Sequence, residues 1–409
     1  MRFRTWAGWL AAVVIVTAGI AAPPDNPTLD GAIARLGVDR WHWAGLRGRG
    51  VKVAILDTGF RGYRNYLGGS LPADTAARSF RFDGDMEAKD SQHGIYCAEV
   101  IHAIAPEAEI LLACWQPDSP ESFVAAVKWA KRRGAKIISC SVIMPCWGDG
   151  EGGGSVHEAL RHILGDGHAA DDVLAVACAG NVAHRHWYGA FRGGPGSDHH
   201  WPNGSIDNNL RAWGDELVSV EICRPTGGGY CLQVVNETGK ELGRVVASAE
   251  DQHNSLVIRF LPEPNSRYAV RIQHAHGFPG PFHLTVLGAS LEQHTIRGSI
   301  PFPGDGPEWL TIGAWENDAR APYSCCGPNS LSLKPDLVAP VPFPGLSRAK
   351  PFGGTSAAAP QAAGLAALYW SRYPKATVAD VRSALCRAAE DLLAPGRDNE
   401  TGHGLLRMP

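Results

Sequence analysis

Short, almost continuous hydrophobic runs recur along the first half of the chain, and a stretch of helical periodicity follows most of them. The runs cover residues 51–56, 109–115, 136–142 and 173–179. Runs without polar alternation are typical of strands that are buried on both faces in a parallel sheet. Between them, amphipathic stretches such as 123–133 predict helices, and this one ends in a basic turn before a glycine. The alternation predicts a parallel sheet with right-handed crossovers.

The pattern changes between about residues 214 and 288, where short strand-like segments follow one another without helical periodicity. Glycine, proline and asparagine turns separate them, which is typical of an antiparallel β-sandwich. The predicted strands are 217–222, 230–235, 256–260, 268–273 and 283–287. The α/β pattern then resumes at 309–314, so the β module is inserted into the α/β domain.

The predicted fold class is therefore α/β, a parallel sheet with helices on both faces, interrupted by a small antiparallel β-sandwich insert. We expect the main domain to comprise residues 23–205 and 301–409, with the insert at 206–300. Near the C-terminal end, a glycine- and alanine-rich stretch predicts a buried, close-packed helix with Ser356 at its mouth, and Pro360 is compatible with its first turn. Two capping boxes predict further helix starts, at Ser155 and at Thr377.

Residues 1–22 have the features of a secretory signal peptide. Arg2 and Arg4 precede an apolar run that ends in small residues, with the expected cleavage near Ala21 or Ala22. An uncleaved membrane anchor is the alternative, because about 17 apolar residues is the lower limit of a spanning length. We expect export, with membrane contact only if the segment stays attached.

Composition narrows the function and the redox state. The 409-residue chain has a net charge of -3, which provides no basic field for nucleic acid. Its ten cysteines, in an exported chain, predict some disulfides. The favoured local pair is Cys223 with Cys231, which flank a turn, whereas Cys140 and Cys178 lie in apolar runs and are expected to be buried thiols.

Three polar residues stand where predicted elements begin or end. Asp57 follows the first strand, His93 lies at the start of a helix that Ser91 caps, and Ser356 opens the alanine-rich helix. Taken alone, each of the three can have a purely structural role: the aspartate in a turn, the histidine in packing and the serine as a helix cap. Functional groups nevertheless gather at the carboxyl ends of strands in open α/β sheets.

Together the three residues offer a complete hydrolytic mechanism. A serine nucleophile needs a base to take its proton, and a histidine base needs a carboxylate to fix its tautomer. An oxyanion also needs donors, and the side chain of Asn181 and the backbone N–H of Ser356 can provide them. The sequence therefore predicts an Asp57–His93–Ser356 triad.

The motifs around these residues resemble those of the subtilisin-like serine peptidases, the subtilase family. They are AILDTG at 54–59, HG at 93–94, ACAGN at 177–181 and GTSAAAP at 354–360, in the order found in that family. The resemblance covers roughly residues 38–406 apart from the insert.

The resemblance implies an endopeptidase that acts on protein or peptide substrates through an acyl-enzyme and needs no cofactor for catalysis. It implies that Ser356 is the nucleophile, His93 the general base and then acid, Asp57 the residue that orients His93, and Asn181 an oxyanion donor. It also implies a specificity pocket lined by Ser141, Cys178, Ala179 and Gly180.

The chain departs from the family at several positions. Ile95 and Tyr96 stand where the family usually has Thr-His, Glu99 replaces a glycine, and Ser141 lacks the usual following glycine. Cys97 matches the cysteine of thiol-containing subtilases of the proteinase K type, which predicts sensitivity to mercurials. The short segment before the main domain has no recognisable folding propeptide.

Other classes fit less well. A catalytically silent relative that binds protein or glycan through the insert remains the alternative. An α/β-hydrolase is excluded, because its Gly-x-Ser-x-Gly motif and residue order are missing. A zinc peptidase would need histidines four residues apart, whereas His157 and His162 are five apart and diverge by about 140° on a helix.

Calcium binding stays open. A loop rich in carboxylates offers oxygen ligands but lacks the spacing of a known calcium loop. Its acidic residues are Asp83, Asp85, Glu87 and Asp90.

Overall fold

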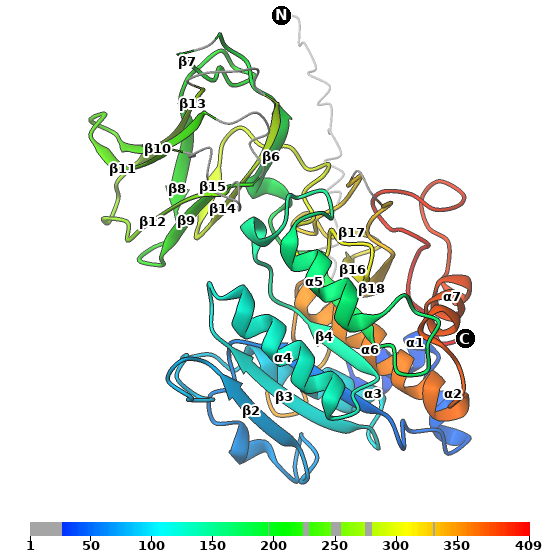
Figure 1. The fold of residues 1–409 in the computed structure, drawn as a ribbon. Helices are drawn as coiled ribbons and strands as arrows, with labels where there is room; N and C mark the ends of the chain where they lie inside the picture. The colour runs from blue at the N-terminus through cyan, green and yellow to red at the C-terminus, as the bar shows by residue number, and fades with distance from the viewer. Residues whose placement is uncertain (1–26, 195, 224–228, 247–254, 275–279, 330–331) are drawn as a thin grey trace, which may run out of the picture.

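The computed structural model describes residues 27–409 apart from 195, 224–228, 247–254, 275–279 and 330–331. Its central sheet has eight strands in the order β17-β16-β5-β4-β1-β3-β2, with β18 paired to β16 (Figure 1). All these pairings are parallel except that of β17, a short edge strand. The strands are β1 (Lys52–Asp57), β2 (Ala76–Phe80), β3 (Glu109–Trp115), β4 (Ile137–Cys140), β5 (Leu174–Cys178), β16 (Trp309–Glu316), β17 (Ala319–Arg320) and β18 (Leu337–Pro340). The predicted α/β class is confirmed.

Helices cover both faces of this sheet. Along β1, Val53 and Ile55 point into one hydrophobic cluster, and Ala54 and Leu56 point into another. The first cluster includes residues of α1, α3, α6 and α7, and the second those of α4 and α5, which lie in front of the sheet in Figure 1. The inner strands, such as β4 and β5, are largely apolar because both of their faces are buried. The helices are α1 (Leu29–Leu36), α2 (Asp39–Trp43), α3 (His93–Ile104), α4 (Pro120–Arg132), α5 (Ser155–Leu164), α6 (Thr355–Arg372) and α7 (Val378–Ala388).

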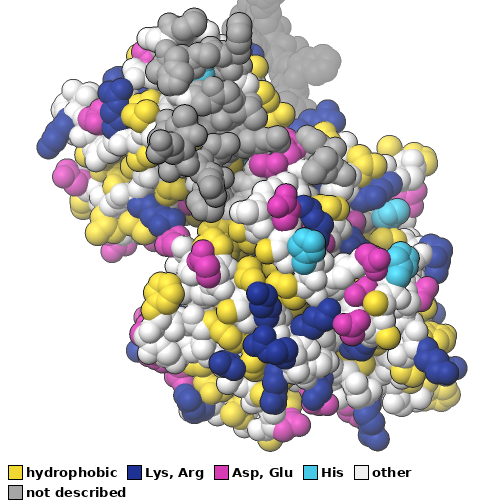
Figure 2. Space-filling model, viewed as in Figure 1, with side chains coloured by type: hydrophobic (Ala, Val, Ile, Leu, Met, Phe, Trp, Pro, Cys, Tyr) yellow, Lys and Arg dark blue, Asp and Glu magenta, His cyan; other side chains and the backbone are white. Residues whose placement is uncertain are grey.

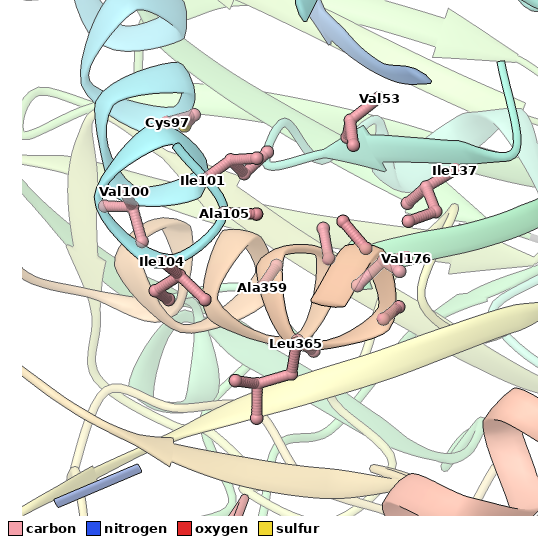
Figure 3. Close-up of a cluster of buried hydrophobic side chains, with 14 of the residues drawn as sticks. Val53, Cys97, Val100, Ile101, Ile104, Ala105, Ile137, Val176, Ala359 and Leu365 are labelled. Atoms are coloured by element: carbon pink, nitrogen blue, oxygen red, sulfur yellow. The ribbon is translucent and has the colours of Figure 1, made fainter. Parts of the chain in front are cut away.

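The helix α6 is the centre of the first cluster, which Figure 3 shows with the side chains of α3 packed against it. It is buried along nearly its whole length, so the small residues of its sequence allow close packing on every side. At Gly364 the fit leaves no room, because a Cβ there would lie 2.8 Å from two side-chain atoms of Ile104. The close approach of α3 and α6 therefore depends on glycine at this position.

Replacing Gly364 with valine is expected to lower the free energy of unfolding by about 1–3 kcal/mol, the usual cost of overpacking. Chemical denaturation measures this cost, and the double variant with Ile104→Ala is the control. Since the clash is with Ile104, the double variant should be more stable than the sum of the two single changes predicts. If the two changes in unfolding free energy were strictly additive, the strain caused by the valine would not come from its contact with Ile104.

Two antiparallel sheets form the insert and pack face to face around a third hydrophobic cluster. One has the order β11-β10-β13-β8-β15, with β7 paired to β13, and the other has the order β12-β9-β14-β6. The predicted antiparallel sandwich is confirmed, and β6 and β7 extend its sheets back to His186. The strands are β6 (His186–Ala190), β7 (Ser197–Asp198), β8 (Asn208–Ala212), β9 (Val218–Cys223), β10 (Tyr230–Asn236), β11 (Glu241–Val246), β12 (Ser255–Phe260), β13 (Tyr268–His274), β14 (Pro281–Leu287) and β15 (Ala289–Leu291).

Some local predictions are wrong. The capping box at Ser155 does not form, because α5 begins at Ser155 itself and Gly154 is its N-cap, whereas the box at Thr377 is confirmed. All ten cysteines are free thiols. Cys223 and Cys231 do not form the expected pair, because β9 and β10, which precede and follow the turn, belong to different sheets of the insert.

The predicted signal peptide at 1–22 lies outside the described residues. Within the part of the chain that the structure describes, none of the helices combines the length and the hydropathy needed to cross a membrane.

Candidate active site

Asp57 is the last residue of β1, and its carboxylate is 1% exposed. Oδ1 accepts the backbone N–H groups of Thr58 at 2.8 Å and Gly59 at 3.0 Å. Oδ2 lies 2.6 Å from Nδ1 of His93. One oxygen therefore fixes the carboxylate to the turn after the strand, and the other is directed at the imidazole.

His93 is the first residue of α3, and its backbone N–H donates to Ser91 Oγ at 3.2 Å. The helix start comes close to the end of β1 because the next residue is Gly94. A Cβ at Gly94 would lie 2.7 Å from Cβ of Asp57. Burial opposes a charge on His93, but the neighbouring carboxylate of Asp57 outweighs it and raises the pKa of the imidazole.

Ser356 is the second residue of α6, which follows Gly354 in the left-handed region with φ 77°. Its Oγ donates to the backbone carbonyl of Ser141 at 3.3 Å. In this state the hydroxyl is directed at the carbonyl of Ser141 and must turn away from it before it can donate to a base. Such loose geometry is common in hydrolases without substrate.

Pro360 is the sixth residue of α6 and does not lie in the expected first turn. As proline has no N–H, the carbonyl of Ser356 loses its helical partner. That carbonyl instead accepts from Ser141 Oγ at 3.2 Å and from Cys97 Sγ at 3.7 Å. Pro360 thus leaves this carbonyl free to accept hydrogen bonds from the segment after β4 and from α3, which connect both to the start of α6.

Asn181 follows β5, and its side chain is oriented by Thr355. Asn181 Oδ1 accepts from the backbone N–H of Thr355 at 3.0 Å and from its Oγ1 at 2.8 Å. Thr355 Oγ1 in turn accepts from the N–H of Gly180 at 3.2 Å. With Oδ1 occupied, Nδ2 is free to donate beside the start of α6. Sequence reasoning missed Thr355, although it stands next to Ser356 in the same motif.

The four predicted pocket residues lie around the start of α6 and the end of β5. Ser141 exchanges two hydrogen bonds with Ser356, and Cys178 and Ala179 are buried in the core. Gly180 has φ 94°, and a Cβ there would lie 3.3 Å from Sγ of Cys325 and 3.4 Å from Cγ2 of Ile143. The surroundings of Gly180 are therefore apolar.

The histidines and carboxylates considered as metal ligands have other partners. His157 lies between Asp305 and Glu308, which overcome the effect of burial and raise the pKa of its imidazole to about 9, while His162 is exposed. These contacts place His157 between two carboxylates. In the acidic loop, Asp83, Glu87 and Asp90 pair with arginines. Across the described residues, Asp57, His93 and Cys97 are the one group of three metal-ligating side chains that comes together.

A mercurial is expected to inhibit the protein through Cys97, which is buried with its sulfur within 4.8 Å of ligand atoms of Asp57 and His93. A soft metal bound there would disturb the imidazole. Turnover of a peptide substrate with and without the mercurial measures the effect. Cys97→Ala should remove the sensitivity, and Cys231→Ala, which lies in the insert, should keep it. Equal inhibition of both variants would assign the effect to another thiol.

The fold is that of a subtilisin-like serine peptidase. A family model described as the subtilase family matches residues 48–210 and 289–404. The chain therefore belongs to the subtilase family of serine-type peptidases. Residues 211–288, between the two matched segments, contain most strands of the insert.

Individual relatives are distant. Subtilisin DY of Bacillus licheniformis is 24% identical over 199 residues, which are 47% of this chain and 71% of the relative. The CspB protease of Clostridium perfringens superposes with a TM-score of 0.67 at 14% identity, covering 93% of this chain and 98% of that one. A lanthipeptide protease gives a TM-score of 0.53 at 17% identity, covering 93% and 96%. At these identities the superpositions show a shared fold.

Proposed function

We propose that this chain is an exported serine endopeptidase that hydrolyses peptide bonds through Asp57, His93 and Ser356. The observation that carries the proposal is the 2.6 Å contact between Asp57 Oδ2 and His93 Nδ1. Ser356 is the second residue of the helix α6. A carboxylate in this position holds the proton on Nδ1, which leaves Nε2 as the base.

The proposed reaction starts when Ser356 Oγ rotates away from the Ser141 carbonyl and gives its proton to His93 Nε2. Oγ then attacks the substrate carbonyl, and Asn181 Nδ2 and the N–H of Ser356 donate to the oxyanion. His93 passes its proton to the leaving amine, which breaks the peptide bond and leaves an acyl-enzyme. A water molecule, activated by His93, then releases the acid.

We further propose that Ser141, Cys178, Ala179 and Gly180 bind the substrate residue before the scissile bond. The apolar neighbours of Gly180 favour an apolar side chain there. The division into a catalytic part at 23–205 and 301–409 and an insert at 206–300, and export through the segment 1–22, complete the proposal. Protein or peptide substrates are the expected partners.

The test is labelling of the purified protein with a serine-directed fluorophosphonate, with mass spectrometry to locate the adduct. We expect the adduct on Ser356 and its loss in Ser356→Ala, because only an activated hydroxyl reacts. Folding of both proteins is checked by circular dichroism. A folded wild-type protein without adduct would favour the alternative, a catalytically silent relative that binds partners through the insert.

Replacing Asn181 with alanine is expected to lower kcat for a peptide substrate about 10²–10³-fold with little change in KM, a magnitude known from subtilisin, a member of the same family. The donor acts on a charge that develops in the transition state. Steady-state kinetics measure the change. Asn203→Ala, an exposed asparagine, is the control. A rise in KM alone would assign Asn181 to substrate binding.

A further inference from the structure

Two thiols from the two parts of the chain lie against each other. Sγ of Cys146 is 3.1 Å from Sγ of Cys223, although 77 positions separate the residues in the sequence. Cys146 lies in the 3-10 helix η2 (Pro145–Trp147) of the main domain, and Cys223 is the last residue of β9 in the insert. A bonded pair would be about 2.05 Å apart, so a movement of about 1 Å joins them.

The backbone around the two sulfurs is already in contact. Sγ of Cys223 donates to the carbonyl of Pro145 at 2.9 Å, and Sγ of Cys146 donates to the carbonyl of Ile222 at 3.4 Å. Each thiol therefore contacts the segment that carries the other. The short movement needed to join them requires no separation of the two parts.

The sheet that carries Cys223 contacts the main domain at two further points. Cys223 lies opposite His283 of β14 in the register, and His283 Nε2 is 3.0 Å from Oε1 of Glu151 in the main domain. On the edge strand β12, Arg259 pairs with Asp118, which follows β3, at 2.7 Å. These contacts join the insert to the main domain on both sides of the two sulfurs and so help to keep the sulfurs close together.

Cys146 is also within reach of solvent. An open cavity of about 840 Å³ lies at the junction of the two parts, and Cys146, Trp147 and Ser255 are among its lining residues. Figure 2 shows apolar side chains along this junction, beneath the insert. Cys223, in contrast, is 2% exposed. An oxidant therefore reaches Cys146 first.

We propose that Cys146 and Cys223 form a disulfide that fastens the insert to the catalytic part. The oxidant is a disulfide compound such as oxidised glutathione. The thiolate of Cys146 attacks it and releases one glutathione, and the thiolate of Cys223 then attacks the Cys146 sulfur and displaces the second. Two electrons pass to the oxidant, and the two protons of the protein thiols end on the two released glutathiones.

The bond would also fix one wall of the proposed pocket. The segment 141–147 runs from Ser141, which exchanges hydrogen bonds with Ser356, to the cysteine at the insert. Its two ends would then be held at the helix α6 and at β9. This consequence for substrate binding rests on the proposed function, whereas the disulfide itself does not.

The experiment uses the full chain. The protein is equilibrated with oxidised glutathione, quenched in acid, alkylated after unfolding and digested without reduction. We expect a linked peptide pair that contains Cys146 and Cys223 and lacks two hydrogen atoms, with the other cysteines alkylated. Alkylation of both residues, a lasting glutathione adduct on Cys146, or a bond between Cys223 and Cys231 would overturn the proposal.

The effect of reduction on the Tm is a second test of the disulfide, and it can be made on the wild-type protein even if a cysteine variant folds poorly. Reduction of the oxidised wild-type protein should lower its Tm by several degrees, because the bond closes a long loop. Cys223→Ser should show no such shift, and Cys231→Ser should show the wild-type shift. Fluorophosphonate labelling is followed in parallel, so that loss of labelling with the cross-link intact overturns only the proposed function. A Tm that does not respond to reduction would overturn the proposed Cys146–Cys223 disulfide.

Discussion

Replacing His93 with alanine is expected to lower kcat for a peptide substrate about 10⁶-fold, the loss known for the corresponding change in a subtilisin. Ser356 keeps its place at the start of α6 but has no base to take its proton. Asp57 also loses the group that it orients at 2.6 Å. The remaining activity would come from substrate binding and the oxyanion donors.

Single-turnover measurements with an activated ester and a peptide amide test this expectation. The matched control is His162→Ala, because His162 is exposed on α5 and has no part in the proposed reaction. Circular dichroism establishes that both variants are folded. If the His93 variant kept more than about a hundredth of the wild-type activity, a different base would have to serve Ser356.

Much of the fold follows from the hydrophobic pattern because burial on two faces leaves a local signature. The strands β1, β3, β4 and β5 are apolar throughout and were predictable. The edge strands were not. In β2 and β11 most side chains are half-buried or exposed, so their sequences contain no run or alternation that distinguishes a strand from a loop.

The sequence could single out Asp57 and Asn181 as candidate site residues because each lies in a short local motif. What the sequence did not reveal depends on contacts between distant segments. Pro360 frees the carbonyl of Ser356, which accepts hydrogen bonds from Ser141 and Cys97. Nothing in the sequence near position 360 indicates those two partners. The same limit explains the cysteines, because nearness in sequence favoured Cys231 as the partner of Cys223.

Replacing Asp57 with asparagine is expected to lower kcat/KM about 10⁴-fold at neutral pH. The asparagine Oδ1 keeps the two bonds to the turn after β1, but its NH₂ group faces His93 where a carboxylate oxygen accepted a hydrogen bond. The imidazole must then accept at Nδ1 and carry its proton on Nε2. In that tautomer Nε2 is no longer a base for Ser356.

The pH profile of the remaining activity separates this role from a structural one. His93 acts as a base only when neutral, so its pKa sets the acid limb of kcat/KM. Asp57 raises that pKa against the effect of burial, so its removal leaves burial and the positive charges of Lys89 and Arg348, which all lower the pKa. The acid limb of Asp57→Asn should therefore move to lower pH, while Asp90→Asn, an exposed aspartate near His93 in sequence, keeps the wild-type limb. An unmoved limb, with activity within tenfold of the wild type, would mean that Asp57 does not control His93.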